Sequence, residues 1–184
     1  MAPTTLYDRL GNYRSMILRV DELCRRIEES LRPKIACTRG CDGCCRHLTL
    51  FPVEAVALAM ALRDLPSQEI TRIREHARTA TPGGPCPLLE HHRCHLYAAR
   101  PLICRTHGLP LLITRGGKRQ VDHCPLNFRG MSSLPGSAVI DLDRLNETLV
   151  AVNALFIASI TPSFSLPERF TIAEALLLDV KDFR

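Results

Sequence analysis

The chain has 184 residues, of which 46% are hydrophobic, so its length and composition suit one domain with an ordinary core. A domain of this size buries roughly 70% of its unfolded surface, and it needs no metal or disulfide to compensate for a small core. The net charge is +5, but Lys and Arg never occur in runs longer than a pair and Trp is absent. These features disfavour nucleic-acid binding.

Neither a secretory signal nor a membrane span is expected. The first fifteen residues contain no apolar segment, and the longest uninterrupted apolar stretch, residues 55–62, is far shorter than the ~20 residues that cross a bilayer. We therefore expect a cytoplasmic protein that does not bind membranes and whose thiols stay reduced. Nine cysteines, an odd number, suit metal ligation better than a complete set of disulfides.

Apolar residues spaced three and four apart predict an N-terminal helix over about residues 6–31, with Pro33 just beyond its end. Cys24 lies on the apolar face of this helix, so we interpret it as a small buried hydrophobic residue rather than a ligand. The apolar positions are Leu6, Leu10, Tyr13, Ile17, Val20, Cys24, Ile27 and Leu31.

Two further helices are predicted before residue 80. Pro52 is well placed in the first turn of a helix that continues through VEAVALAMALRDL, which is apolar nearly all round and is expected to be buried. Ser67 is expected to cap a helix from Gln68 to about Arg78. The sequence TPGGPCP then ends helical structure.

Residues 86–124 are expected to be irregular and to contain two short hairpins. One is predicted within CPLLEHHRCHLY, and the other within LLITRGGKRQV, where Gly116 and Gly117 would form the turn. This part of the chain is therefore expected to be tightly folded but to have little regular structure.

Two C-terminal helices are predicted. Asp141 is expected to cap the first, and Ser165 with Glu168 forms a capping-box pattern for the second. The predicted inward-facing residues are Leu142, Leu145, Leu149, Val152 and Phe156 in the first helix and Phe170, Ala173, Leu177 and Val180 in the second.

The resulting fold class is mostly α: a small helical domain with an irregular cysteine-rich insert, including short β-hairpins, organised around metal. We predict one domain over residues 1–184. It would comprise an N-terminal helix in 1–33, a metal-binding region in 35–129 and a C-terminal helical pair in 139–184.

The most informative pattern in the sequence is its cysteine content. Four cysteines fall within nine residues, and four more follow within eighty. Thiolates are soft, negatively charged ligands whose usual partners are zinc and iron. Gly40 and Gly43 each precede a cysteine and allow tight backbone turns. The predicted metal ligands are Cys37, Cys41, Cys44, Cys45, Cys86, Cys94, Cys104 and Cys124.

Eight thiols exceed the four that a structural zinc ion or a cubane iron–sulfur cluster takes. The adjacent Cys44 and Cys45 should point in different directions, which favours two metal centres or one site with spare thiols. Nearby arginines could offset part of the thiolate charge, and nearby histidines leave a mixed Cys/His site open. These residues are Arg39, Arg46, Arg100 and Arg105, and His47, His91, His92, His95, His107 and His123.

With this order and spacing of cysteines and an RPxxCR motif, the sequence resembles the YkgJ-type cysteine-cluster family (CxxCxxCC type), a zinc- or iron-chelating domain. The resemblance covers about residues 35–126 and implies that the eight cysteines chelate metal, with Cys24 outside the set. Beyond the cysteines it rests on Tyr97, Arg100, Pro101 and Arg105.

Three functions remain open at this stage. The first is a cytoplasmic metal-binding protein that holds iron, as an iron–sulfur cluster, or zinc. The second is an S-adenosylmethionine-dependent methyl-transfer or radical enzyme that uses Cys37, Cys41 and Cys44, although such enzymes generally need a large α/β barrel. The third is a thiol-redox protein, for which the thioredoxin-like βαβ context is missing. The sequence identifies no protein partner, oligomeric state or catalytic residue.

Overall fold

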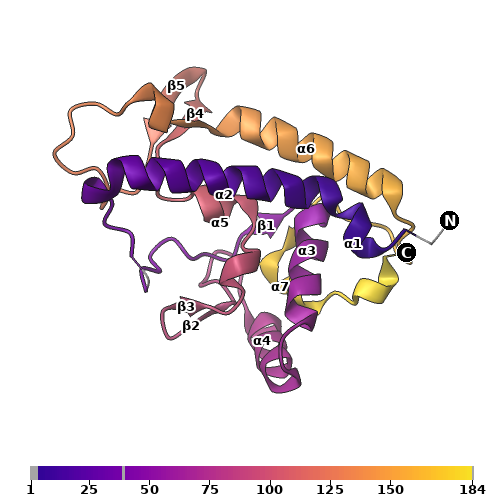
Figure 1. Cartoon of the computed structure of the whole chain (residues 1–184). Helices are drawn as coiled ribbons and strands as arrows, with labels where there is room; N and C mark the ends of the chain where they lie inside the picture. Colours follow the sequence, from indigo (N-terminus) through magenta and orange to yellow (C-terminus); the bar gives the residue numbers. More distant parts are fainter. Residues whose placement is uncertain (1–3, 39, 184) are drawn as a thin grey trace.

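The computed structural model describes residues 4–38 and 40–183. The fold is mostly helical, with small sheets of two or three strands (Figure 1). Its α-helices are α1 (Leu6–Arg9), α2 (Gly11–Leu31), α3 (Pro52–Arg63), α4 (Ser67–Thr79), α5 (Leu102–Thr106), α6 (Leu142–Ser159) and α7 (Ile172–Leu177). Its 3-10 helices are η1 (Arg32–Lys34), η2 (Tyr97–Ala99), η3 (Gly136–Ala138) and η4 (Val180–Asp182).

Three small sheets join segments that are distant in the chain. The strands are β1 (Thr49–Leu50), β2 (Leu89–Glu90), β3 (Arg93–Cys94), β4 (Leu111–Arg115), β5 (Lys118–Asp122), β6 (Ile140–Asp141) and β7 (Phe170–Thr171). The predicted hairpins are confirmed as β2–β3 and β4–β5. The parallel pair β4–β6 and the antiparallel pair β1–β7, each only two residues long, were not predicted.

The N-terminal helix follows the predicted face but is interrupted. Thr5 caps α1 reciprocally with Asp8, and the helix then breaks at Leu10 before α2 begins at Gly11. The predicted apolar positions from Leu10 to Leu31 are all buried, Cys24 among them. Apolar spacing therefore identified the buried face, although it gave no sign of the break.

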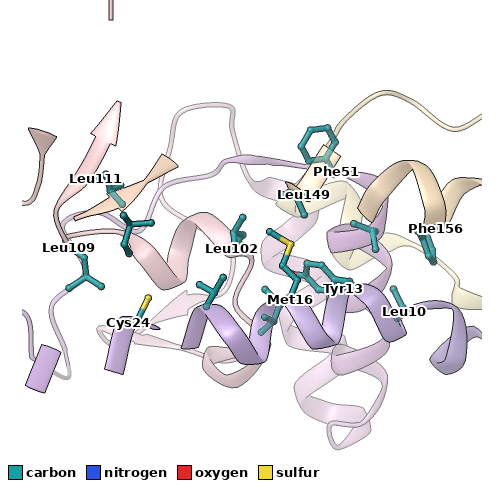
Figure 2. Packing of buried hydrophobic residues seen from close by; sticks show 14 of the residues in the cluster. Leu10, Tyr13, Met16, Cys24, Phe51, Leu102, Leu109, Leu111, Leu149 and Phe156 are labelled. Carbon is teal, nitrogen blue, oxygen red and sulfur yellow. The ribbon is translucent and has the colours of Figure 1, made fainter. Parts of the chain in front are cut away.

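The first core lies where α2 packs against α5 and α6, and Figure 1 shows α2 and α6 running side by side. Asp141 caps α6 as predicted, its Oδ1 accepting from the Arg144 N–H at 3.1 Å. Leu149 and Phe156 on α6 are buried in this core. Members labelled in Figure 2 are Leu10, Tyr13, Met16, Cys24, Phe51, Leu102, Leu109, Leu111, Leu149 and Phe156.

A second core lies between α3, α4 and α7, with the β2–β3 hairpin beside it. Helix α3 begins at Pro52 as predicted and is largely buried. Ser67 was predicted to cap α4, and this prediction is wrong. Ser67 is instead the first residue of α4, which has no side-chain cap. Second-core residues are Leu50, Ala55, Leu58, Leu62, Ile73, Ala77, Leu88, Leu96, Phe170, Ile172, Ala173, Ala175 and Leu176, and the partly buried Cys86 and Cys94 pack against them.

The other wrong cap concerns the last helix. Thr171 and Glu174 form the capping box of α7, so the helix starts later than the Ser165–Glu168 pattern predicted. Leu177, expected to face inward, is 40% exposed. Helix α7 packs against α3 and α4, while α6 packs against α2, α3 and β4.

Candidate metal centre

Residues 37–45 carry the first four cysteines on a backbone whose described residues form neither helix nor strand. Two tight turns shape it. The Cys41 N–H donates to the Thr38 carbonyl oxygen at 3.0 Å, and the Cys45 N–H donates to the Asp42 carbonyl oxygen at 2.8 Å. These turns bring the thiols close together along a short length of chain.

The two glycines of this segment behave differently. Gly40 has φ of +98°, a conformation that side-chain-bearing residues rarely adopt, as expected for a glycine in a tight turn. Gly43 does not adopt a positive φ. Most of the segment faces solvent: its exposed cysteines are Cys37, Cys41 and Cys44, while Cys45 is half-buried.

Asn127, which no sequence pattern singled out, fixes the start of this segment. Its Oδ1 accepts from the N–H groups of Ala36 and Cys37, at 2.8 and 3.2 Å. Its Nδ2 donates to the Gly108 carbonyl oxygen at 2.7 Å and to the Cys37 Sγ at 3.3 Å. One buried amide thus joins Cys37 to the chain around residue 108.

Gly108, which accepts a hydrogen bond from Asn127, also lies between Cys37 and Cys124. Gly108 has φ of +90°, and a Cβ placed on it would lie 3.3 Å from the Cys37 Sγ and 3.6 Å from the Cys124 Cβ. The Cys124 N–H also donates to the Gly108 carbonyl oxygen at 3.4 Å. Two cysteines separated by most of the metal-binding region therefore flank one glycine.

A second set of contacts joins Cys45 to the segment that follows α4. The Cys86 N–H donates to the Cys45 carbonyl oxygen at 3.2 Å, and Arg46 forms an antiparallel bridge with Pro85. In the β2–β3 hairpin, Cys94 lies opposite Leu89. Cys86 therefore meets Cys45 at the edge of the second core, against which Cys86 and Cys94 both pack.

The turn of this hairpin also contacts the first cysteine segment. His91 and His92, the two residues of the turn, have φ of +47° and +60°, as a tight turn of this kind requires. The His92 Nδ1 lies 2.8 Å from the Asp42 Oδ2. This contact adds a tie between the hairpin and the first cysteine segment, both of them partly exposed.

Cys104 lies on α5, and buried polar groups fix that helix. The Glu54 carboxylate in α3 accepts from the Leu102 N–H at 3.0 Å. Arg105 donates to both carboxylate oxygens of Asp21 in α2, at 2.7 and 2.6 Å, with its side chain only 7% exposed. The second Arg of the RPxxCR motif is therefore a structural link between α5 and α2.

Electrostatic surroundings place the thiols in two overlapping groups, with Cys45 a neighbour of both. Burial raises the pKa of Cys37, and the neighbouring thiols of Cys124 and Cys41 raise it further, against a hydrogen bond from Asn127. Burial also raises the pKa of Cys44, with added contributions from Cys45, Cys41 and Cys124. The first group of thiols is thus Cys37, Cys41, Cys44 and Cys124, and Cys45 adjoins it through Cys44.

The other cysteines form a second neighbourhood. Burial raises the pKa of Cys104 to about 12, and the thiols of Cys86, Cys94 and Cys45 add to the shift. Burial likewise raises the pKa of Cys86 to about 11, with Cys94 and Cys45 contributing in the same direction. With pKa values this high, Cys86 and Cys104 are protonated at neutral pH, so a metal that bound them would have to displace the protons.

Of the arginines expected to offset thiolate charge, Arg100 is placed to do so. Burial raises the pKa of both Cys94 and Cys104, and the Arg100 guanidinium opposes that increase. Arg105 instead pairs with Asp21. Arg39 lies outside the described residues.

Two of the nearby histidines, His47 and His95, have both ring nitrogens in contact with groups other than thiols. The His47 Nδ1 lies 3.0 Å from the Thr81 carbonyl oxygen, and its Nε2 accepts from the Ala173 N–H. His95 contacts a carboxylate with each ring nitrogen, Glu69 at 3.1 Å and Glu90 at 2.9 Å. Both rings are therefore held by other groups of the protein, and the candidate donor set is the eight cysteines.

This donor set suits a thiophilic metal in chemistry and number. No disulfide links any of the nine cysteines, all of which lie in the described part of the chain. Within residues 4–38 and 40–183, no three Cys, His, Asp or Glu side chains are already positioned around a common point as the ligands of one ion. Full ligation would therefore require closure of the exposed turns.

The described residues also bear on the alternative functions. Their sheets have two or three strands, so this part of the chain does not form the large α/β barrel of radical enzymes. None of the helices found in the described residues is long and apolar enough to cross a membrane.

Comparison with known proteins identified one family. The model named CxxCxxCC, with the description "Putative zinc- or iron-chelating domain", matches residues 36–125. No curated protein and no solved structure matched the chain. The matched residues span all eight predicted ligands and exclude Cys24.

Proposed function

Because residues 36–125 match the CxxCxxCC family model, whose description is a zinc- or iron-chelating domain, we propose that this protein binds zinc or iron through eight cysteine thiolates. The observation that supports this most is the convergence of distant cysteine-bearing segments. Asn127 and Gly108 join Cys37 to Cys124, and a backbone hydrogen bond joins Cys86 to Cys45. The proposed ligands are Cys37, Cys41, Cys44, Cys45, Cys86, Cys94, Cys104 and Cys124.

The donor type limits the metal to a small group. Thiolates select zinc, copper(I) and iron–sulfur clusters over hard ions such as magnesium and calcium. A site built from cysteine alone fits tetrahedral zinc or an iron–sulfur cluster equally well, and of the two we favour iron held as iron–sulfur. The metal would organise the cysteine-rich insert of the helical domain.

Reduced thiols are a condition of this function. We propose a cytoplasmic location, where the reducing environment keeps cysteines available as ligands. The disulfide-free state of the nine cysteines agrees with that environment. The metal would then enter through the exposed side of the 37–45 segment.

Elemental analysis of protein purified without oxygen tests the proposal. The expected result is zinc or iron at one or more equivalents per chain, with acid-labile sulfide and a brown colour if iron is bound as a cluster. Cys24→Ala serves as a matched control, because it removes a thiol from the first core and should keep the same metal content. A folded, metal-free protein whose thiols all react freely would contradict the proposal.

A further inference from the structure

We infer that the eight cysteines form two separate four-thiolate metal sites, one at the surface and one against the second core. This inference rests on the proposed function and adds to it which cysteine serves which metal. The outer set is Cys37, Cys41, Cys44 and Cys124. The inner set is Cys45, Cys86, Cys94 and Cys104.

The outer set is defined by the contacts around Gly108. The Cys37 Sγ and the Cys124 Cβ approach the same glycine, and Asn127 holds Cys37 there through its side chain and its backbone. A Cβ at residue 108 would crowd this approach, and φ of +90° already favours glycine. Gly108 therefore permits the two ends of the outer set to meet.

The remaining outer cysteines follow from the turns of the first segment. The hydrogen bond from the Cys41 N–H to the Thr38 carbonyl oxygen folds Cys41 back toward Cys37. The hydrogen bond from the Cys45 N–H to the Asp42 carbonyl oxygen closes the next turn, and Cys44 lies exposed in it, as Cys37 and Cys41 are exposed before it. Four thiols from two segments thus share one surface neighbourhood.

The inner set is built on regular structure. Cys86 is hydrogen-bonded to Cys45 through the backbone, and Cys94 lies in strand β3 of the adjoining hairpin. Cys86 and Cys94 pack against the second core. Cys104 lies in α5, whose first residue, Leu102, is bound by the buried Glu54. Segments from three parts of the chain thus carry the four cysteines of the inner set, and two of these cysteines pack against the second core.

The division falls at the peptide bond between Cys44 and Cys45. Successive side chains point in different directions, so one of this pair can face each set. Cys44 is exposed on the first segment together with Cys37 and Cys41, whereas Cys45 is half-buried and its carbonyl oxygen accepts from the Cys86 N–H at 3.2 Å. Four thiolates complete the tetrahedral shell of zinc or hold one cubane cluster, so two sets of four leave no cysteine over.

Charge also favours two centres over one assembly of eight thiolates. A divalent ion with four thiolates is a dianion, and separating two dianions reduces their mutual repulsion. The chain carries a formal net charge of +5, and Arg100 lies near the inner thiols. The two sites are therefore compatible with the charge of the whole chain.

Metal counting in matched variants of the full chain tests the division. Protein prepared without oxygen and loaded with zinc is expected to bind two equivalents. Cys37→Ser with Cys124→Ser should leave one equivalent, and so should Cys86→Ser with Cys104→Ser. Cys24→Ser, which changes a buried cysteine outside both sets, should retain two.

Cobalt(II) in place of zinc gives a second measurement, because tetrahedral thiolate coordination produces characteristic absorption. The outer double variant, altered in exposed or half-exposed residues, should keep half of the wild-type signal with an unchanged band shape. If the protein carries clusters instead, the same halving is expected in iron and acid-labile sulfide.

The outcomes separate this inference from the function on which it rests. A folded wild-type protein that binds neither zinc nor iron would contradict both. Wild-type protein that binds metal, while the outer double variant loses all of it, would overturn the two-site division alone. Retention of two equivalents by that variant would overturn the assignment of Cys37 and Cys124.

Discussion

The outer and inner cysteine sets differ in what holds them in place. The outer set depends on exposed turns, one glycine and the amide of Asn127. The inner set lies on a hairpin, a helix and the edge of the second core. The same ligand chemistry is thus supported in one place by a few hydrogen bonds and in the other by packing. Changes to the protein should therefore affect the two sets unequally.

Removing the metal is expected to have the largest effect on stability. Structural zinc is worth on the order of 10–16 kcal/mol in small peptides, which is comparable with the net stability of a domain. After chelation, amide hydrogen exchange should accelerate over residues 86–124 while α2 and α6 stay protected, because their burial is apolar. Uniform loss of protection would show that metal holds the entire fold, and unchanged protection would show that it is peripheral.

Replacing Asn127 should affect the outer set alone. Asn127→Ala removes four hydrogen bonds and leaves buried groups without partners, for an expected loss of about 1–3 kcal/mol in the free energy of unfolding. We expect it to weaken binding of one of two zinc equivalents, measured by competition with a chelator.

Asn153 provides a matched control for this experiment. It is also a buried amide, and its Oδ1 accepts from the Val53 N–H at 3.1 Å, far from the cysteines in sequence. Asn153→Ala should lower the free energy of unfolding without changing either zinc affinity. Equal loss of both zinc equivalents in the Asn127 variant would contradict the independence of the two sets.

A smaller loss in the free energy of unfolding is expected for Cys24→Ala. Cys24 is 5% exposed within the first core, and burial raises the pKa of its thiol to about 11. The resulting cavity should cost about 1–2 kcal/mol, measured by urea unfolding, with metal content unchanged. Loss of metal would show that α2 contributes a ligand.

The smallest effect is expected on metal affinity, from replacing Arg100, the cation near the inner set. Arg100→Gln removes a charge that opposes the burial-driven increase in the pKa of Cys94 and Cys104. We expect metal affinity of the inner set to fall by less than about tenfold, and the effect to shrink at high salt. Arg115→Gln, on the exposed end of β4, should change neither affinity. A loss that is the same at all salt concentrations would point to packing instead.

Local patterns predicted the parts of the fold that depend on local forces. The spacing of Tyr13, Ile17 and Val20 identified the buried face of α2, because a helix places residues three and four apart on one side. The Gly116–Gly117 turn was recognisable because adjacent glycines favour a hairpin turn in which both residues have positive φ. In the structure these φ values are +58° and +75°. Such features need no knowledge of distant residues.

The wrong cap of α7 shows where local patterns fail. Ser165 with Glu168 and Thr171 with Glu174 both fit a capping box, and the sequence alone does not rank them. The second is used because Phe170 pairs with Leu50 in the β1–β7 sheet and is buried in the second core. Contacts across the chain therefore decide the start of the helix.

The hydrogen-bonding role of Asn127 and the division of the cysteines could not be predicted either, because both depend on contacts between distant parts of the chain. Asn127 bonds Gly108, 19 residues away, and Ala36, 91 residues away, and no periodicity marks such partners. The sequence identified all eight candidate ligands from their chemistry and suggested that Cys44 and Cys45 separate. Which distant thiols accompany each of them depends on how the chain returns at Cys86 and Cys124.

The position of Cys124 beside Cys37 has a consequence for biosynthesis. The inner set ends with Cys104, whereas the outer set waits for the last of the eight cysteines. At about 5–20 residues per second, translation of the intervening chain takes roughly 1–4 s. A nascent chain would therefore complete its inner ligands first, while three exposed thiols of the outer set remain open to oxidation or to a competing ion. Metal delivery during synthesis would be most valuable in that interval.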